Sequence, residues 1–132
     1  MDDSSVVQIT DFPSLEKIVR KIGIEAIPGK ENGVPVLTVT IKRIMFMALV
    51  HNQCLKLVYR MREDKFAGGV IFANRWNMMN LIGTLVPMTD GFIMKHETLA
   101  SHGLVVGNLK DTLISFAASV DKFQDELFSL DS

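Results

Sequence analysis

The residues in this sequence with the greatest intrinsic reactivity are three histidines and one cysteine. His51, His96 and His102 are widely separated, and none lies four positions from a second histidine or a carboxylate within a predicted helix. A zinc site needs three or four ligands that converge on one point, so this spacing does not predict a metal site. Cys54 lies across a predicted turn from His51, and a nucleophilic cysteine needs an adjacent base. We interpret Cys54 as a small packed residue, with a Cys54–His51 pair as the alternative.

The other arrangements that carry out catalysis are also missing from the sequence. It contains no paired carboxylates, no nucleophile–base–acid triad and no phosphate-binding glycine loop followed by lysine and serine or threonine. We therefore expect a protein that is not an enzyme, has no catalytic residues and requires no metal or organic cofactor.

One segment combines an indole with amide side chains, namely Asn74, Trp76 and Asn77. Such a cluster could recognise a small molecule by stacking and hydrogen bonding. In a helix, Trp76 could equally be part of the core while Asn77 bonds to a nearby loop backbone. The pattern favours the structural role, and a small-molecule sensor domain with a pocket near Trp76 is the alternative.

A second candidate site lies on a predicted strand at 44–50 that is apolar on both faces. Met45, Met47 and Leu49 share one of these faces. Flexible thioether side chains suit binding of varied partners, and an uncovered apolar patch on a stable protein marks an interface. We interpret these three residues as a candidate partner-binding surface.

The elements that must position these residues follow from hydrophobic periodicity and turn dipeptides. Pro28-Gly29 and Asn32-Gly33 predict turns before the first strand. The predicted elements are a helix at 11–22, strands at 34–41, 44–50 and 53–61, a helix at 70–83, strands at 85–88 and 92–99, and a helix from 108 onward. The order α-β-β-β-α-β-β-α predicts an α+β fold, an antiparallel β-sheet with flanking helices on one face.

The last predicted helix has the most regular pattern in the chain. Asn108 is its predicted N-cap, and apolar residues then alternate at spacings of four and three: Leu109, Leu113, Phe116, Val120, Phe123, Leu127 and Leu130. This seam either packs on the sheet of its own chain or joins two chains. We expect a homodimer, with the interface at the Met45–Met47 strand face more than at this helix.

Length and charge limit the classes of function. The 132 residues predict a single domain at 1–132, with residues 1–10 flexible because no periodic pattern begins before Asp11. The 14 basic and 15 acidic residues nearly cancel, which disfavours nucleic acid as a partner. The longest apolar run, 44–50, is too short to span a membrane, and no signal-like pattern opens the sequence. We expect a cytoplasmic protein.

The half of the chain from Phe66 to Leu127 resembles the YbjN family, described as bacterial sensory transduction regulators. The matching features are the Trp76-Asn77 pair, the Asp90-Gly91 turn and the strand that leads to Leu99. They continue with the Gly103-Leu104-Val105 step and a final helix from Asn108 with Leu109 and Phe123. The first half resembles the family in layout, with a helix followed by three strands.

This resemblance implies a fold similar to that of type III secretion chaperones, which are small, cytoplasmic, dimeric proteins that bind segments of partner proteins. It also implies a role in bacterial stress responses or sensory regulation. The sequence therefore predicts a non-enzymatic interaction protein, a chaperone-like or regulatory adaptor that binds protein segments.

Overall fold

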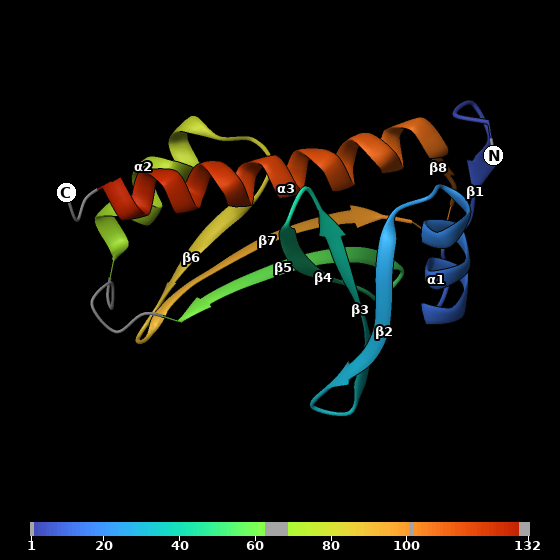
Figure 1. The fold of residues 1–132 in the computed structure, drawn as a ribbon, viewed down its shortest axis with the longest axis horizontal. Helices are drawn as coiled ribbons and strands as arrows, with labels where there is room; N and C mark the ends of the chain where they lie inside the picture. Colours follow the sequence, from blue (N-terminus) through green and yellow to red (C-terminus); the bar gives the residue numbers. More distant parts are fainter. Residues whose placement is uncertain (1, 63–68, 101, 130–132) are drawn as a thin grey trace.

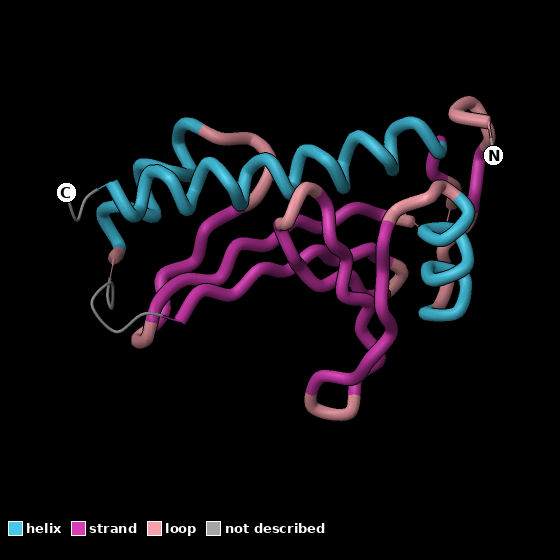
Figure 2. The backbone as a smooth tube through the Cα atoms, in the orientation of Figure 1, coloured by secondary structure: helices cyan, strands magenta, loops and turns pink. Residues whose placement is uncertain are grey.

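The chain folds into an α+β structure built on a six-stranded antiparallel sheet with helices packed beside it (Figures 1 and 2). The computed structural model describes residues 2–62, 69–100 and 102–129. The elements are β1 (Val6–Val7), α1 (Phe12–Lys21), β2 (Glu25–Glu31), β3 (Val34–Ile41), β4 (Ile44–His51), β5 (Cys54–Arg62), α2 (Val70–Met79), β6 (Thr84–Met88), β7 (Gly91–Leu99), β8 (Leu104–Val105) and α3 (Val106–Ser129).

The strand order across the large sheet is β2-β3-β4-β5-β7-β6, and every neighbouring pair is antiparallel. Three successive hairpins join β2 to β5 through two-residue turns at 32–33, 42–43 and 52–53, in which every residue has a positive φ. Such turns match the twist of the strands that they connect. The predicted strands at 34–41, 44–50, 53–61, 85–88 and 92–99 all correspond to observed strands within two residues at each end.

The strand β2 is not among the strands that the sequence predicts. Pro28-Gly29 was expected to form a turn, but both residues lie within β2, at one edge of the sheet. Proline is tolerated in an edge strand because no neighbour on the open side requires its missing N–H. The observed meander therefore has four strands before α2 rather than three.

The helix α3 covers one face of the sheet, and its apolar seam packs against its own chain. The six described seam residues are all buried: Leu109, Leu113, Phe116, Val120, Phe123 and Leu127. The rings of Phe116 and of Phe46 on β4 meet edge to face with centroids 5.0 Å apart. The predicted seam residue Leu130 lies outside the described residues. Because the seam is buried within the chain, it is not available as a contact between two chains.

The segment before α1 pairs with distant parts of the chain. Residues 1–10 were predicted to be flexible, yet β1 pairs with β8, and the buried Ile9 donates its backbone N–H to the carbonyl of Ala100 at 3.3 Å. The carbonyl oxygens of Asp3 and Ser5 accept hydrogen bonds of 2.8 Å from the N–H groups of Gly107 and Val106. A two-residue strand held by a distant segment is too short to give a periodic pattern.

These bonds also explain where α3 begins. The prediction that Asn108 caps this helix was wrong, because α3 already starts at Val106. The first N–H groups of a helix lack partners within the helix, and here the backbone carbonyls of the N-terminal segment supply them. The ammonium of Lys110 also lies 2.6 Å from a carboxylate oxygen of Asp3.

Candidate binding surfaces

The face of the sheet opposite α3 carries the predicted partner-binding residues. Figure 1 shows α2 and α3 on one side of the sheet, while the β2–β3 hairpin extends from the other side. Met45, Met47 and Leu49 alternate with the buried residues Phe46 and Ala48 along β4, so they point away from the core. Met45 is 58% exposed. The structure thus places all three predicted residues on a face that α3 does not cover.

This face is hollowed where the sheet splays. Strands β4 and β5 pair from His51 and Cys54 as far as Met47 and Val58, whereas β5 continues beside β7 to its end. A cavity of about 200 Å³ lies at this divergence, and a second cavity of about 530 Å³ adjoins it. The two share Met47, Val58 and Arg60 as lining residues.

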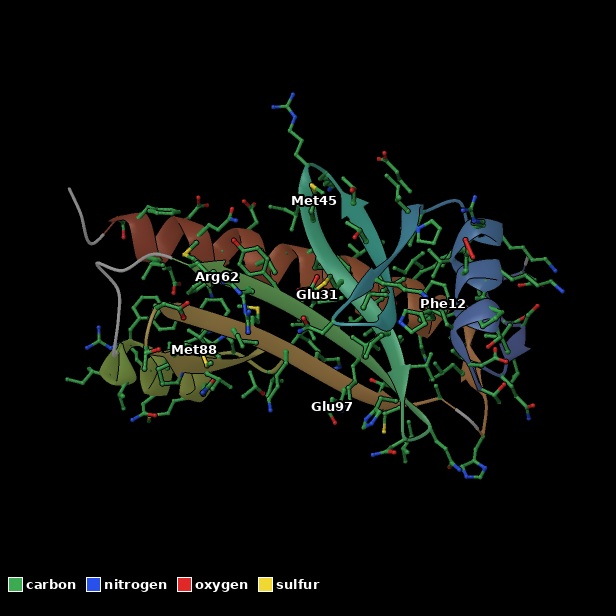
Figure 3. The ribbon with its side chains drawn as sticks, turned by 90° about the horizontal axis from the view of Figure 1, so that it is seen from below. Phe12, Glu31, Met45, Arg62, Met88 and Glu97 are labelled. Atoms are coloured by element: carbon green, nitrogen blue, oxygen red, sulfur yellow. The ribbon has the colours of Figure 1, made fainter. Side chains whose placement is uncertain are left out.

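The larger cavity is bounded on one side by the end of the β2–β3 hairpin and on the other by β5 and β7. Glu31 at the end of β2 and Arg62 at the end of β5 both line this cavity, and both are labelled in Figure 3, the view from below. We call the two joined cavities the sheet-face groove, and define it by these residues: Glu31, Met45, Met47, Val58, Arg60 and Ile93.

A second apolar surface lies on α2, and the sequence reading did not identify it as a site. Leu81, just after the helix, is 98% exposed, Met78 is 86% exposed and Ile71 is 79% exposed. Together with Val70 and Met79 these residues form what we call the outer α2 face. The available signal was that the apolar residues of α2 occupy more positions than a single buried stripe needs.

The opposite side of α2 is anchored by Trp76, which is only 2% exposed. Its indole N–H donates to the backbone carbonyl of Gly83 at 2.9 Å, and its ring packs against Phe123 of α3. The ammonium of Lys122 lies 5.7 Å from the ring centroid. The indole is therefore enclosed by protein groups, as the structural interpretation of the Trp76 cluster requires.

The two asparagines of the cluster have different surroundings. The Asn77 amide accepts from the N–H of Leu85 at 2.7 Å and donates to the carbonyl of Leu85 at 2.9 Å. It thereby occupies both main-chain groups that β6, an edge strand, turns outward at Leu85. Asn74 is exposed on α2. The predicted cluster is thus divided, with Trp76 and Asn77 fastening α2 to the sheet and Asn74 outside that contact.

A cavity of about 300 Å³ adjoins Trp76 between α2 and α3. Its lining includes Phe72, Arg75, Met79, Lys122 and Glu126. The ammonium of Lys122 donates to the side-chain oxygen of Asn80 at 2.9 Å and lies 4.0 Å from a carboxylate oxygen of Glu126. This cavity is where a small-molecule pocket near Trp76 would have to lie.

The histidines and Cys54 are not brought together into a reactive group. Cys54 lies opposite His51 in the β4–β5 hairpin, but the hydrogen-bond neighbour of the His51 ring is the Lys56 ammonium, 3.3 Å from Nδ1. His96 lies on the core-facing side of β7, where burial lowers its pKa. His102 is exposed. Within residues 2–62, 69–100 and 102–129, no three histidine, cysteine or carboxylate side chains are grouped closely enough to hold a metal ion.

Comparison of the chain with known proteins gives no further assignment, since no family model and no curated protein matches it. The resemblance to the YbjN family stays a prediction from the sequence. Among the described helices, none has the length and apolar character needed to cross a membrane.

Proposed function

We propose that this protein is a non-enzymatic interaction protein, a chaperone-like or regulatory adaptor that holds an apolar segment of a partner protein in the sheet-face groove. The observation that carries the proposal is the row of apolar side chains on the uncovered face. In register across the sheet lie Met47 on β4 and Val58 on β5, with Ile93 on β7 one row further along. Burying such side chains is favourable by about 25 cal/mol per Å² of apolar surface.

The edges of the sheet favour docking on this face over addition of a strand. Strand addition requires free main-chain groups along an edge. At β6 the Asn77 amide already occupies both groups of Leu85, and Pro87 has no N–H. At β2, Pro28 lacks an N–H and charged residues, Glu25, Lys30 and Glu31, line the strand. Charges and prolines on an edge are devices that prevent pairing.

We also propose a homodimer, formed through the outer α2 face. The sequence predicts the interface at the Met45–Met47 face, but Ile71, Met78, Met79 and Leu81 are each more exposed than Met45. A dimer through α2 leaves the groove open for a partner.

One free cysteine suits a reducing compartment. The resemblance to the YbjN family implies a cytoplasmic protein with a role in stress or sensory regulation.

The experiment that tests the groove is site-specific photo-crosslinking. A photoreactive side chain replaces Met47 in one variant and Lys17, exposed on α1, in the control. Partners that crosslink at position 47 and not at position 17 are then purified. Their binding to the protein without the photoreactive side chain is measured by titration. We expect Met47→Glu to weaken this binding at least tenfold without lowering the melting temperature. Equal binding by Met47→Glu and the unaltered protein would contradict the proposal.

The second candidate function is a small-molecule sensor domain, favoured by the cavity beside Trp76. A reproducible rise in melting temperature with a metabolite would indicate it, because a ligand stabilises the state that binds it. The residue to alter is Arg75, which lines this cavity and is remote from the groove. If Arg75→Gln lost the thermal shift and Met47→Glu kept it, the function as a small-molecule sensor domain would be supported.

A further inference from the structure

The charged side chains on the face that carries the sheet-face groove are not all paired within the described residues. At one end the ammonium of Lys56 lies 3.8 Å from a carboxylate oxygen of Glu97. At the other end Arg62 lies 4.0 Å from Asp90. Between these pairs, Arg60 lines both cavities and has no carboxylate within 4 Å in the part of the chain that the structure describes.

A second cation lies on the same face of the sheet. Lys95 lies in register with Val58, on the same face as Arg60, and the described residues again include no carboxylate within 4 Å of it. The acidic residue of the groove is Glu31, which stands on the facing wall and forms no ion pair with Arg60. The middle of the groove therefore offers apolar side chains beside a guanidinium that no described carboxylate pairs with.

The main-chain hydrogen bonds of a bound segment determine which secondary structure it should have. A segment lying on the face of a sheet gains no main-chain hydrogen bonds from it, and a buried N–H or C=O without a partner costs free energy. An α-helix satisfies these groups internally. A helical segment also presents apolar and charged side chains three and four positions apart on one side.

We propose that the sheet-face groove binds an amphipathic helix of a partner protein, whose apolar stripe packs on Met47, Val58 and Ile93 and whose acidic side chain pairs with Arg60. This inference rests on the proposed function and names the chemistry of its partner. Arginine forms a bidentate pair with a carboxylate, and such charge-assisted bonds are stronger than neutral ones. The ion pair between Arg60 and the acidic side chain determines which apolar helices bind to the groove.

The test uses synthetic helical peptides of about 16 residues, long enough to populate a helix. All carry the same leucine and methionine stripe on an alanine and glutamine background. They differ at two positions beside the stripe, which are glutamate, glutamine or lysine. Binding to the full chain is measured by fluorescence anisotropy. We expect the glutamate peptide to bind about tenfold more tightly than the glutamine peptide, and the lysine peptide to bind most weakly.

Variants of the protein assign the effect to one residue. Arg60→Gln should bring the glutamate and glutamine peptides to equal affinity, and Arg60→Glu should reverse the preference toward lysine. The matched control is Arg75→Gln, which removes one positive charge from α2 and should keep the preference. Arg60 is exposed, so melting temperatures should match among the variants and any loss of binding is not a loss of fold.

The outcomes separate this inference from the proposed function. If all three peptides bound with equal affinity and Met47→Glu abolished this binding, the acidic preference would be contradicted. The proposal that the groove binds a partner segment would then still stand. Binding of none of them would contradict both. If decanoate displaced the glutamate peptide and bound with the same dependence on Arg60, the occupant would be a small anionic amphiphile and not a helix.

Discussion

The sheet-face groove and the outer α2 face both expose apolar side chains, but they differ in shape and charge. The groove is concave, is built from residues of β2, β4, β5 and β7, and contains Arg60, which has no ion-pair partner among the described residues. The outer α2 face comes from one continuous segment and reaches 98% exposure at Leu81, and the helix α2 itself carries one charged residue, Arg75. The difference teaches that exposure alone does not define a specific site. A hollow with a fixed charge can choose among partners, whereas a plain apolar helix face suits packing on an identical helix.

The largest effect is expected from the residue that fixes α2 on the sheet. Trp76→Ala should lower the free energy of unfolding by about 3–5 kcal/mol, because a buried aromatic ring is removed and a cavity remains. Urea unfolding measures this. Trp76→Phe, which keeps a ring and loses the bond to Gly83, should cost less. An unchanged urea midpoint together with lost ligand binding would instead assign Trp76 to a binding pocket.

A smaller loss is expected at Asn77. Asn77→Ala removes both hydrogen bonds to Leu85 and should cost about 1–3 kcal/mol, the range for leaving polar partners unsatisfied. Asn74→Ala is the matched control on the same helix. It should change stability by less than about 0.5 kcal/mol, as for most exposed substitutions. Equal costs for the two variants would contradict the division of the cluster.

The third prediction separates the two apolar surfaces directly. Light scattering at micromolar concentration should give about twice the chain mass of 14.7 kDa. Met78→Glu on the outer α2 face should weaken dimerisation at least tenfold, because a charge would be buried in the interface. Met47→Glu should leave the dimer intact. A monomeric unaltered protein would refute the dimer, and dissociation by Met47→Glu alone would restore the strand interface predicted from the sequence.

The smallest effect concerns His96, on the core-facing side of the sheet. Burial lowers the pKa of His96 from its ordinary value of 6.5. The unfolded chain therefore takes up a proton at a higher pH than the folded chain does. Stability should fall as the pH drops below about 6.5 and stop falling once the folded form is also protonated. Urea midpoints across this range should show a weaker pH dependence in His96→Gln. An identical slope in both proteins would contradict this assignment.

Most of the large sheet was predictable because its signals are local. The predicted strand at 53–61 matches β5, in which Leu55 and Leu57 are buried and Arg60 is exposed. The seam of α3 was equally clear, and its packing on its own sheet was one of the two expectations. By contrast, β1 and β2 depend on partners rather than on their own patterns. A Pro-Gly pair indicates a turn by itself, and only the neighbouring strand β3 holds it extended.

The residues of the proposed binding surface could be predicted in part. Met45, Met47 and Leu49 followed from the apolar pattern of one strand. The role proposed for Arg60 did not follow from any pattern, because it depends on the place where β4 and β5 diverge, and this divergence arises from the pairing of three strands. Exposure on α2 was also hidden, since an apolar helix can as readily be fully buried.

The bonds between the segment before α1 and the start of α3 have a consequence for synthesis on the ribosome. Asp3 and Lys110 are joined although they stand 107 positions apart. The carbonyl groups of Asp3 and Ser5 therefore cannot bond to the first turn of α3 until most of the described chain has been synthesised. Contacts of such long sequence separation slow folding and leave apolar surface open to association meanwhile. In pulse-labelling hydrogen exchange, the amides of Val106 and Gly107 should be among the last to become protected.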